Sequence, residues 1–377
     1  MKITVTDNNA MHYMQWMKVD APAAIELRPS GIAQMNTDQL SFTTDDIEIK
    51  STGFYGDNEL VQLVADHQNV KNAQILLVPG ASSGIFIAMA AACTNAGRSI
   101  LIEEHAYEPI IRAAETLGLK ITRLPRKQEG DFEIRMETLE ERLREGVDAL
   151  FITNHHNPSG FLLNPDRMQE IQTRCAEHKT QLIVDEVYLR GAAITKQGQA
   201  WSAAECGPNV ITINSLTKLH GFSGLRCGWL TGHPILIDAA RRIMDVLSVN
   251  NAGPAMSLAK VVLKHAETWE EQYAERQRQS RQVLDTWLQQ EERVTTYPDH
   301  GHLYACLKFL PTVTTDGRST PFNADEFTRQ LREDFDTAVV PGSFFDLPDH
   351  VRIGLGANQQ MLEQGLTNIS NCLDQFP

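Results

Sequence analysis

A single lysine stands within a segment whose residue types suit carbonyl chemistry. Residues 215–229 read SLTKLHGFSGLRCGW and include Lys218. An amine attacks a carbonyl only when part of it is unprotonated, which requires partial desolvation and a nearby cation. Ser215 and Arg226 suit a phosphate, and the glycines let the backbone approach a flat ligand. The segment therefore predicts a Schiff base between Lys218 and pyridoxal phosphate (PLP), the alternative being an ordinary solvated lysine.

A carboxylate ends one of the apolar segments. Asp185 closes the run QLIVD at residues 181–185, and Tyr188 follows three residues later. A buried carboxylate needs a partner, and a protonated pyridine nitrogen would serve, because the ion pair makes the ring a stronger electron sink. Tyr188 could then donate to the ring's phenolic oxygen. A helix cap and a core tyrosine are the alternatives, whereas a nucleotide hydrolase is disfavoured because the chain has no GxxxxGK[ST] loop.

Two polar turns follow predicted strands. Residues 80–84, GASSG, would open a helix whose free amides attract an anion, although an ordinary capped turn has the same composition. Residues 154–160, NHHNPSG, favour a polar turn from which Asn157 reaches a ligand. The neighbouring His155 and His156 point in opposite directions on an extended segment, and no HExxH motif or third clustered ligand accompanies them. We therefore expect no metal ion.

Two more residues could contact a flat, anionic ligand. Tyr107 follows a predicted strand, where its ring could stack on the ligand or simply pack in the core. Arg352 lies in the apolar run VRIG at residues 351–354. An arginine there suits a carboxylate, which it can bind through two hydrogen bonds, and a structural salt bridge is the alternative.

Bulk properties narrow the class of protein. The 377 residues carry a net charge of −14, which argues against nucleic acid and against anionic lipid as partners. No apolar run reaches the roughly 18 residues of a membrane span. The six cysteines form no CxxC pair and resemble reduced thiols, and we find no signal segment. We expect a cytoplasmic protein that binds neither nucleic acid nor a membrane.

The predicted elements alternate between strands and helices. Strands are expected at 74–79, 99–103, 120–124, 148–153, 181–185 and 210–214, with helices at 84–93, 109–117 and 136–145. This order predicts an α/β fold with a mainly parallel sheet, which binds ligands beyond the carboxyl ends of its strands. After about residue 250 long helical stretches and short strands predict a smaller α+β domain. We expect a large domain at 45–250 and a small one built from 1–44 and 251–377.

Taken together, these motifs resemble the class I and II aminotransferases, which are PLP enzymes of fold type I. The resemblance spans about residues 31–352 and depends mainly on the pattern S-x-x-K-x-x-G-x-x-G-x-R-x-G. It implies that Lys218 forms the internal aldimine and then shuttles protons. It also implies an amino acid substrate and a homodimer with sites at the interface.

The resemblance also assigns roles to the other site residues. Asp185 would pair with the pyridine nitrogen, Tyr188 and Asn157 would contact the phenolic oxygen, and Tyr107 would stack on the ring. Phosphate contacts would come from Ala81, Ser82, Ser215 and Arg226. The substrate's α-carboxylate would bind Arg352 and the backbone of Gly31, with Asn157 beside it. Tyr55 would reach the phosphate of the neighbouring subunit.

The chain departs from the family pattern at several positions. The usual N-P-x-N-P-T-G turn has His155 in place of its first proline and Ser159 in place of threonine. Tyr55 lies closer to the following glycine than is typical. We find no clear second arginine for a dicarboxylate side chain, which puts aspartate or glutamate as the main amino donor in doubt.

The sequence predicts an aminotransferase of amino acid metabolism and biosynthesis that passes an amino group to a 2-oxo acid. The alternative is an elimination and cyclisation enzyme, a cyclodehydratase acting on a hydroxylated amino acid such as a hydroxyarginine. His155 and His156 could assist elimination, and the acidic residues near the amino terminus could steer a cationic side chain. A PLP-sensing regulator would need a DNA-binding domain, and an inactive scaffold would not need every cofactor contact.

Overall fold

A mixed sheet of seven strands forms the centre of the larger part of the protein. The computed structural model describes residues 12–19, 22–50, 55–71, 74–94, 98–195, 201–313 and 319–376. The strand order is β2-β8-β7-β6-β5-β3-β4. The strands are β2 (Ile75–Val78), β3 (Ser99–Glu103), β4 (Lys120–Leu124), β5 (Ala149–Thr153), β6 (Gln181–Asp185), β7 (Val210–Ser215) and β8 (Gly228–Gly232).

The sheet is parallel from β4 to β7, as the alternating elements predict. Strand β8 was not predicted, and it runs antiparallel to both β2 and β7. Its sequence GWLTG is short and has a glycine at each end, and glycine is depleted in strands. The α/β fold with a mainly parallel sheet is therefore confirmed, with one antiparallel strand inserted beside β2.

Apolar residues on both faces of the sheet hold helices against it. Ile100 and Ile102 of β3 face one side, where α3 (Ala81–Ala92), α4 (Glu108–Thr116) and α8 (Pro234–Leu247) pack. Leu101 faces the other side, toward α5 (Met136–Arg144) and α6 (Pro165–Glu177). Near β2 and β8 that side is covered by α2 (Asn58–Gln68) and α9 (Gly253–Lys264). Successive strand residues point to opposite faces, so a sheet covered on both sides needs the continuous apolar runs seen in the sequence.

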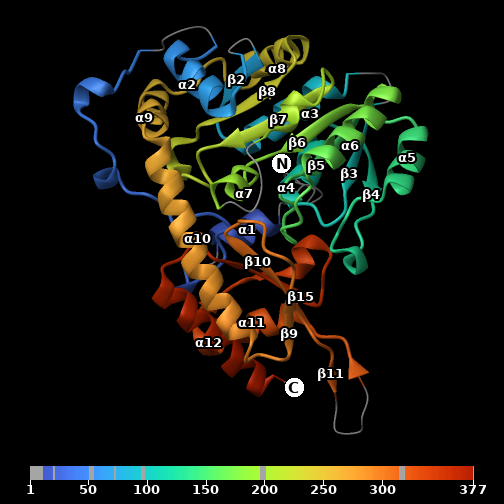
Figure 1. Cartoon of the computed structure of the whole chain (residues 1–377), viewed down its shortest axis with the longest axis vertical. Helices are drawn as coiled ribbons and strands as arrows, with labels where there is room; N and C mark the ends of the chain where they lie inside the picture. The colour runs from blue at the N-terminus through green and yellow to red at the C-terminus, as the bar shows by residue number, and fades with distance from the viewer. Residues whose placement is uncertain are drawn as a thin grey trace, which may run out of the picture.

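A second sheet lies in the C-terminal part, below the first in Figure 1. Its order is β14-β15-β10-β9, and all three pairings are antiparallel. Helix α10 runs along the side of the molecule from the first sheet to the second. The elements are α10 (Ala266–Leu288), β9 (Val294–Thr296), β10 (Tyr304–Phe309), α11 (Ala324–Phe335), β14 (Val340–Pro341), β15 (His350–Gly354) and α12 (Gln359–Gln375).

The N-terminal segment joins this C-terminal part. Strand β1 (Ile25–Glu26) pairs in parallel with β13 (Thr337–Ala338), and Leu27 lies in the same apolar cluster as α12. Helix α9, in contrast, packs on α2 beside the larger sheet. The domain boundaries at residues 44 and 250 stay a prediction. The remaining elements are α1 (His12–Val19), α7 (Arg190–Ile194), β11 (Thr312–Val313), β12 (Ser319–Thr320) and the 3₁₀ turns at 37–39, 44–46, 128–130, 203–205, 223–225 and 342–345.

Among the residues that the structure describes, no helix combines the length and apolar character needed to cross a lipid bilayer. All six cysteines are free thiols.

Candidate active site

One cavity of about 560 Å³ lies where strands β5, β6 and β7 end and helix α3 begins. Because the carboxyl ends of parallel strands meet at one edge, residues far apart in the sequence meet there. With the exception of Gly31 and Tyr55, the predicted site residues line this cavity: Ala81, Ser82, Tyr107, Asn157, Asp185, Tyr188, Ser215, Lys218, Arg226 and Arg352.

Lys218 extends its amine into the cavity. Its Nζ donates a hydrogen bond to Ser30 Oγ (3.0 Å) and lies 5.9 Å from the centre of the Tyr188 ring. Burial lowers the pKa of Lys218, and the nearby Arg352 cation lowers it further. A larger fraction of this amine is therefore unprotonated at neutral pH than for a solvated lysine, as a nucleophilic amine requires.

Asp185 is a carboxyl group at the end of β6 that is only 6% exposed. It accepts a hydrogen bond from the Val187 N–H (3.1 Å), and burial raises its pKa to about 7. A cation placed against it in the cavity would favour the ionised form. The site therefore fits a ligand that carries a protonated ring nitrogen.

Ser30 connects two of the predicted residues and was not itself predicted. Its buried Oγ accepts from Lys218 Nζ and lies 2.8 Å from the Tyr188 hydroxyl. Burial raises the pKa of Tyr188 to about 12, so this phenol stays protonated and can donate. The signal in the sequence was weak, namely a serine beside the predicted Gly31.

The first turn of α3 forms a cradle for an anion. Gly80 precedes the helix with a positive φ of 81° and has no side chain to cap it, so the amides of the first turn stay available. A Cβ at Gly80 would collide with the guanidinium of Arg226, which lies directly against this turn. Ser82 and Ser215 line the same cavity. These donors suit a phosphate group.

Arg352 is buried on β15, where its guanidinium donates hydrogen bonds to uncharged oxygen atoms. Its Nη1 donates to Asn157 Oδ1 (3.1 Å), and its Nη2 donates to Tyr13 OH (3.0 Å) and to the Arg28 carbonyl (2.9 Å). Its Nε has no hydrogen-bond partner within the described ranges. An unpaired buried donor beside a cavity favours an anionic ligand over the structural salt bridge considered above.

Helix α1 closes one side of the cavity and was missed in the sequence analysis. Tyr13, Met14 and Lys18 line the cavity, and Tyr107 OH lies 3.2 Å from Met14 Sδ. The Tyr13 and Tyr107 rings meet edge to face at 5.4 Å. Apolar pairs at residues 13–14 and 16–17, each followed by a polar residue in HYMQWMKV, are the one sequence signal that could have identified this helix.

Two predicted residues lie outside the cavity lining. Gly31 packs against the Lys218 backbone, since a Cβ there would come within 2.6 Å of the Lys218 carbonyl oxygen. Tyr55 is 45% exposed, and its hydroxyl lies 3.4 Å from Asp245 of α8. The contact of Tyr55 with a neighbouring subunit stays a prediction.

The two neighbouring histidines have separate surroundings. His156 Nδ1 lies 2.7 Å from Ser159 Oγ, and its Nε2 lies 3.3 Å from the Glu104 carbonyl. His155 packs against His302 instead, with ring centres 5.4 Å apart. The structure thus gives each ring its own neighbours.

Comparisons with known proteins identify the family of this chain. The family model described as "Aminotransferase class I and II" matches residues 37–369. An aspartate aminotransferase of Sulfurisphaera tokodaii is 19% identical, over 86% of this chain and 82% of its own.

Solved structures share the fold. A PLP-dependent aminotransferase from Streptococcus suis 89-1591 superposes with a TM-score of 0.88 at 20% identity, covering 97% of each chain. The PLP-dependent cyclase OrfR superposes with a TM-score of 0.85 at 20% identity and is covered in full, as is this chain. Because the family model covers well over half of the sequence, the chain belongs to the class I and II aminotransferase family and is a PLP-dependent enzyme of fold type I.

Proposed function

We propose that this cavity transfers the amino group of an amino acid to a 2-oxo acid, with PLP held at Lys218. The observation that carries the proposal is a single cavity that combines the Lys218 amine, the protonatable Asp185 carboxyl and the anion cradle at α3. These groups match the aldehyde, the ring nitrogen and the phosphate of one small molecule.

The chain's own residues would fix the cofactor at each end. Asp185 would pair with the pyridine nitrogen, Tyr188 and Asn157 would contact the phenolic oxygen, and Tyr107 would cover the ring. The phosphate would lie in the cradle formed by Ala81, Ser82, Ser215 and Arg226. When bound, PLP supplies an electron sink that stabilises negative charge at the substrate's α-carbon.

Lys218 is the base in this proposal. Its pKa is lowered, so its Nζ can take the proton from the substrate's α-carbon once the amine is free. Ser30 Oγ, 3.0 Å away, holds the amine in place. A base held within hydrogen-bond reach gains from orientation as well as from basicity.

Arg352 and Lys18 would determine how the substrate lies. Arg352 would bind the α-carboxylate through its free Nε and the Nη groups that now contact Asn157 and Tyr13. Lys18 of α1 lines the same cavity. A lysine there could bind a second carboxylate in place of the missing second arginine.

A second candidate is a PLP-dependent elimination and cyclisation reaction on a hydroxylated amino acid. This second candidate is supported by the similarity to the cyclase OrfR, which covers the full length of both chains. The charges around the cavity favour transamination of an anionic substrate, because Lys18 and Arg352 remain as cations once Lys218 and Arg226 are assigned to the cofactor, and Asp185 is the one carboxylate among the described lining residues.

The assembly and the location belong to the same proposal. A homodimer with shared sites would explain an exposed tyrosine at position 55. Six free thiols are what a reducing cytoplasm would maintain.

The test is a panel of amino acids with the purified holoenzyme, in which the absorbance of the cofactor and the product mass are followed together. We expect conversion to the pyridoxamine form with release of a 2-oxo acid. Lys218→Ala should lose the visible absorbance of the lysine-bound cofactor and slow the reaction by about 10⁴-fold, while Lys127→Ala on the surface should change neither. Loss of water from a hydroxylated substrate with its amine retained would establish the cyclisation reaction instead.

A further inference from the structure

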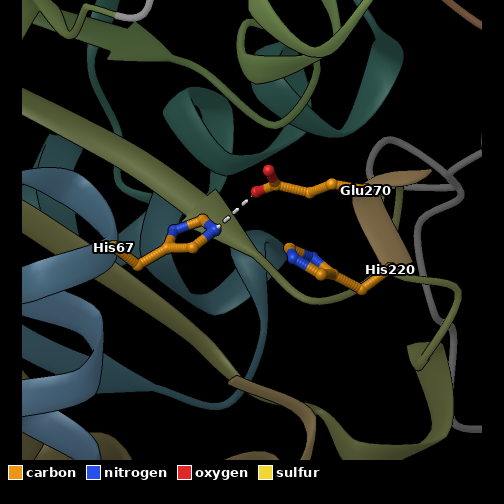
Figure 2. A group of neighbouring side chains, drawn as sticks. All are labelled: His67, His220 and Glu270. Carbon is orange, nitrogen blue, oxygen red and sulfur yellow. Dashed lines mark hydrogen bonds and ion pairs between the residues drawn. The ribbon is translucent and has the colours of Figure 1, made fainter. Parts of the chain in front are cut away.

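Three side chains of metal-binding type meet outside the PLP cavity. His67 comes from α2, Glu270 from the first turns of α10, and His220 from the loop after β7, two residues beyond Lys218. Figure 2 shows both imidazole rings and the carboxylate converging on one space. Their ligand atoms all lie within 4.8 Å of one another.

The surroundings of His220 are the main argument for a bound ligand. It is 2% exposed, and neither ring nitrogen has a hydrogen-bond partner in the described part of the chain. Its ring lies against His67, with centres 5.6 Å apart. A buried polar group without a partner costs free energy, so a ligand that accepts a nitrogen lone pair would stabilise the fold.

The protonation states suit a metal. Burial lowers the pKa of His220 to about 3 and also lowers the pKa of His67, so both rings are neutral at pH 7. Glu270 forms an ion pair with Arg190, so its carboxylate is ionised. Two neutral imidazoles and one carboxylate are the ligand forms that a transition metal binds.

Two contacts now occupy the carboxylate. His67 Nε2 lies 3.3 Å from Glu270 Oε1, and Arg190 forms an ion pair with the same oxygen. The Arg190 side chain is 32% exposed and can turn toward solvent. Beside the cluster lies a cavity of about 180 Å³, lined by His67, Arg190 and Glu186, which has room for a water ligand.

We propose that His67, His220 and Glu270 bind one zinc-type divalent cation, with water in the fourth position. The ligand atoms around tetrahedral zinc lie about 3.4 Å apart when each bond is about 2.1 Å, so small side-chain rotations would close the site. This departs from the expectation of no metal drawn from the sequence. The ion would tie the Lys218 loop to α10, the helix that runs between the two sheets (Figure 1).

The probe is Zn²⁺ alone, added to holoenzyme that has been dialysed against EDTA, with a chromophoric chelator as competitor. We expect about one tight Zn²⁺ per chain. His220→Asn and His67→Asn should each weaken binding by more than the roughly 10–100-fold that follows loss of an outer partner. The matched control is His178→Gln, because His178 also pairs with a glutamate, Glu140 at 3.2 Å, on the surface. It should leave Zn²⁺ binding unchanged.

A second variant separates metal binding from a merely structural role. Arg190→Gln removes the cation that competes for Glu270, so it should tighten Zn²⁺ binding, whereas a purely structural ion pair predicts no tightening. Circular dichroism and the cofactor's visible band show whether each variant is folded. The proposal is wrong if the folded wild type binds no tight Zn²⁺, or if it binds Zn²⁺ equally well after both histidines are replaced.

Discussion

Asp185 should make the stability of the cofactor-free protein depend on pH. Burial raises its folded-state pKa to about 7 from the ordinary 3.8, so the folded state holds a proton that the unfolded state releases. The stability from this group is present below pH 4 and is lost as the pH rises through about 7. At about 1.4 kcal/mol per pKa unit, the loss is a few kcal/mol.

Urea unfolding at pH 5 and pH 8 measures this loss. From pH 5 to pH 8 the wild-type apoprotein should lose more stability than Asp185→Asn, which has no titrating group at position 185. Glu186→Gln is the matched control, because burial also raises the pKa of Glu186 to about 7 but its carboxylate accepts from Ser202 and Ala203 rather than facing the PLP cavity. PLP should remove the pH dependence due to Asp185 and leave that due to Glu186. An equal effect of PLP on both would contradict the pairing of Asp185 with the ring nitrogen.

Arg352 should act on substrate binding more than on turnover. Arg352→Lys keeps the charge but loses the planar group that presents several donors at once. We expect KM for the amino acid to rise about 10–100-fold, equivalent to one or two lost charged hydrogen bonds, with a smaller change in kcat. Steady-state kinetics measures both constants. Arg167→Lys on α6, whose ion pairs are exposed, should change neither, and a fall confined to kcat in Arg352→Lys would contradict its role.

The segment after β1 is fixed against the loop that carries Lys218. The Ile32 N–H donates to the Lys218 carbonyl (3.0 Å), and Gly31 leaves no space for a Cβ against the same residue. Gly31→Ala should therefore displace the Lys218 backbone and cost about 1–3 kcal/mol, as overpacking does. Gly130→Ala is the control, because nothing lies within 4 Å of a Cβ there.

The readouts for this pair are the melting temperature and the visible band of bound PLP. Gly31→Ala should lower the melting temperature and shift or weaken the PLP band. Gly130→Ala should change neither the melting temperature nor the band. An unchanged band in a folded Gly31→Ala protein would mean that the contact does not position the lysine.

The sequence predicted the elements with strong local patterns and missed those set by distant contacts. Continuous apolar runs located β3 and β6 to the residue, because buried parallel strands leave that signal. Strand β8 has no such run and exists because β2 and β7 pair with it. The long helical region expected after about residue 250 is interrupted at His265, where α9 ends and α10 begins.

The same distinction applies to the site. Lys218, Asp185 and Arg226 lie in motifs that can be recognised from the neighbouring residues alone. Ser30 and Tyr13 gain their importance from hydrogen bonds to partners 188 and 339 residues away, Lys218 and Arg352 respectively. No local pattern encodes such contacts, because they depend on how the N-terminal segment lies against the Lys218 loop and β15.

Tyr55 is the residue that would connect two copies of the chain. Its ring lies on the surface near α8, with the Arg241 guanidinium 5.4 Å from its centre. It is absent from the lining of its own cavity, as a residue that serves a partner's site would be. A two-fold dimer would place each Tyr55 against the other chain with the same geometry.

Mixing two variants, each of which lacks one group of the proposed shared site, tests this arrangement directly. Lys218→Ala lacks the amine, and Tyr55→Phe lacks the hydroxyl proposed to hold the partner's phosphate. In a mixed dimer, the site built on the intact Lys218 receives the intact Tyr55 of the other chain, so about a quarter of all sites should recover tight PLP binding after random exchange. Equilibrium dialysis at limiting PLP measures this recovery, and analytical ultracentrifugation checks that the mass is twice the 42.2 kDa of one chain. If Tyr55 served its own chain's site instead, no mixed dimer would contain a complete site, and mixing would recover nothing.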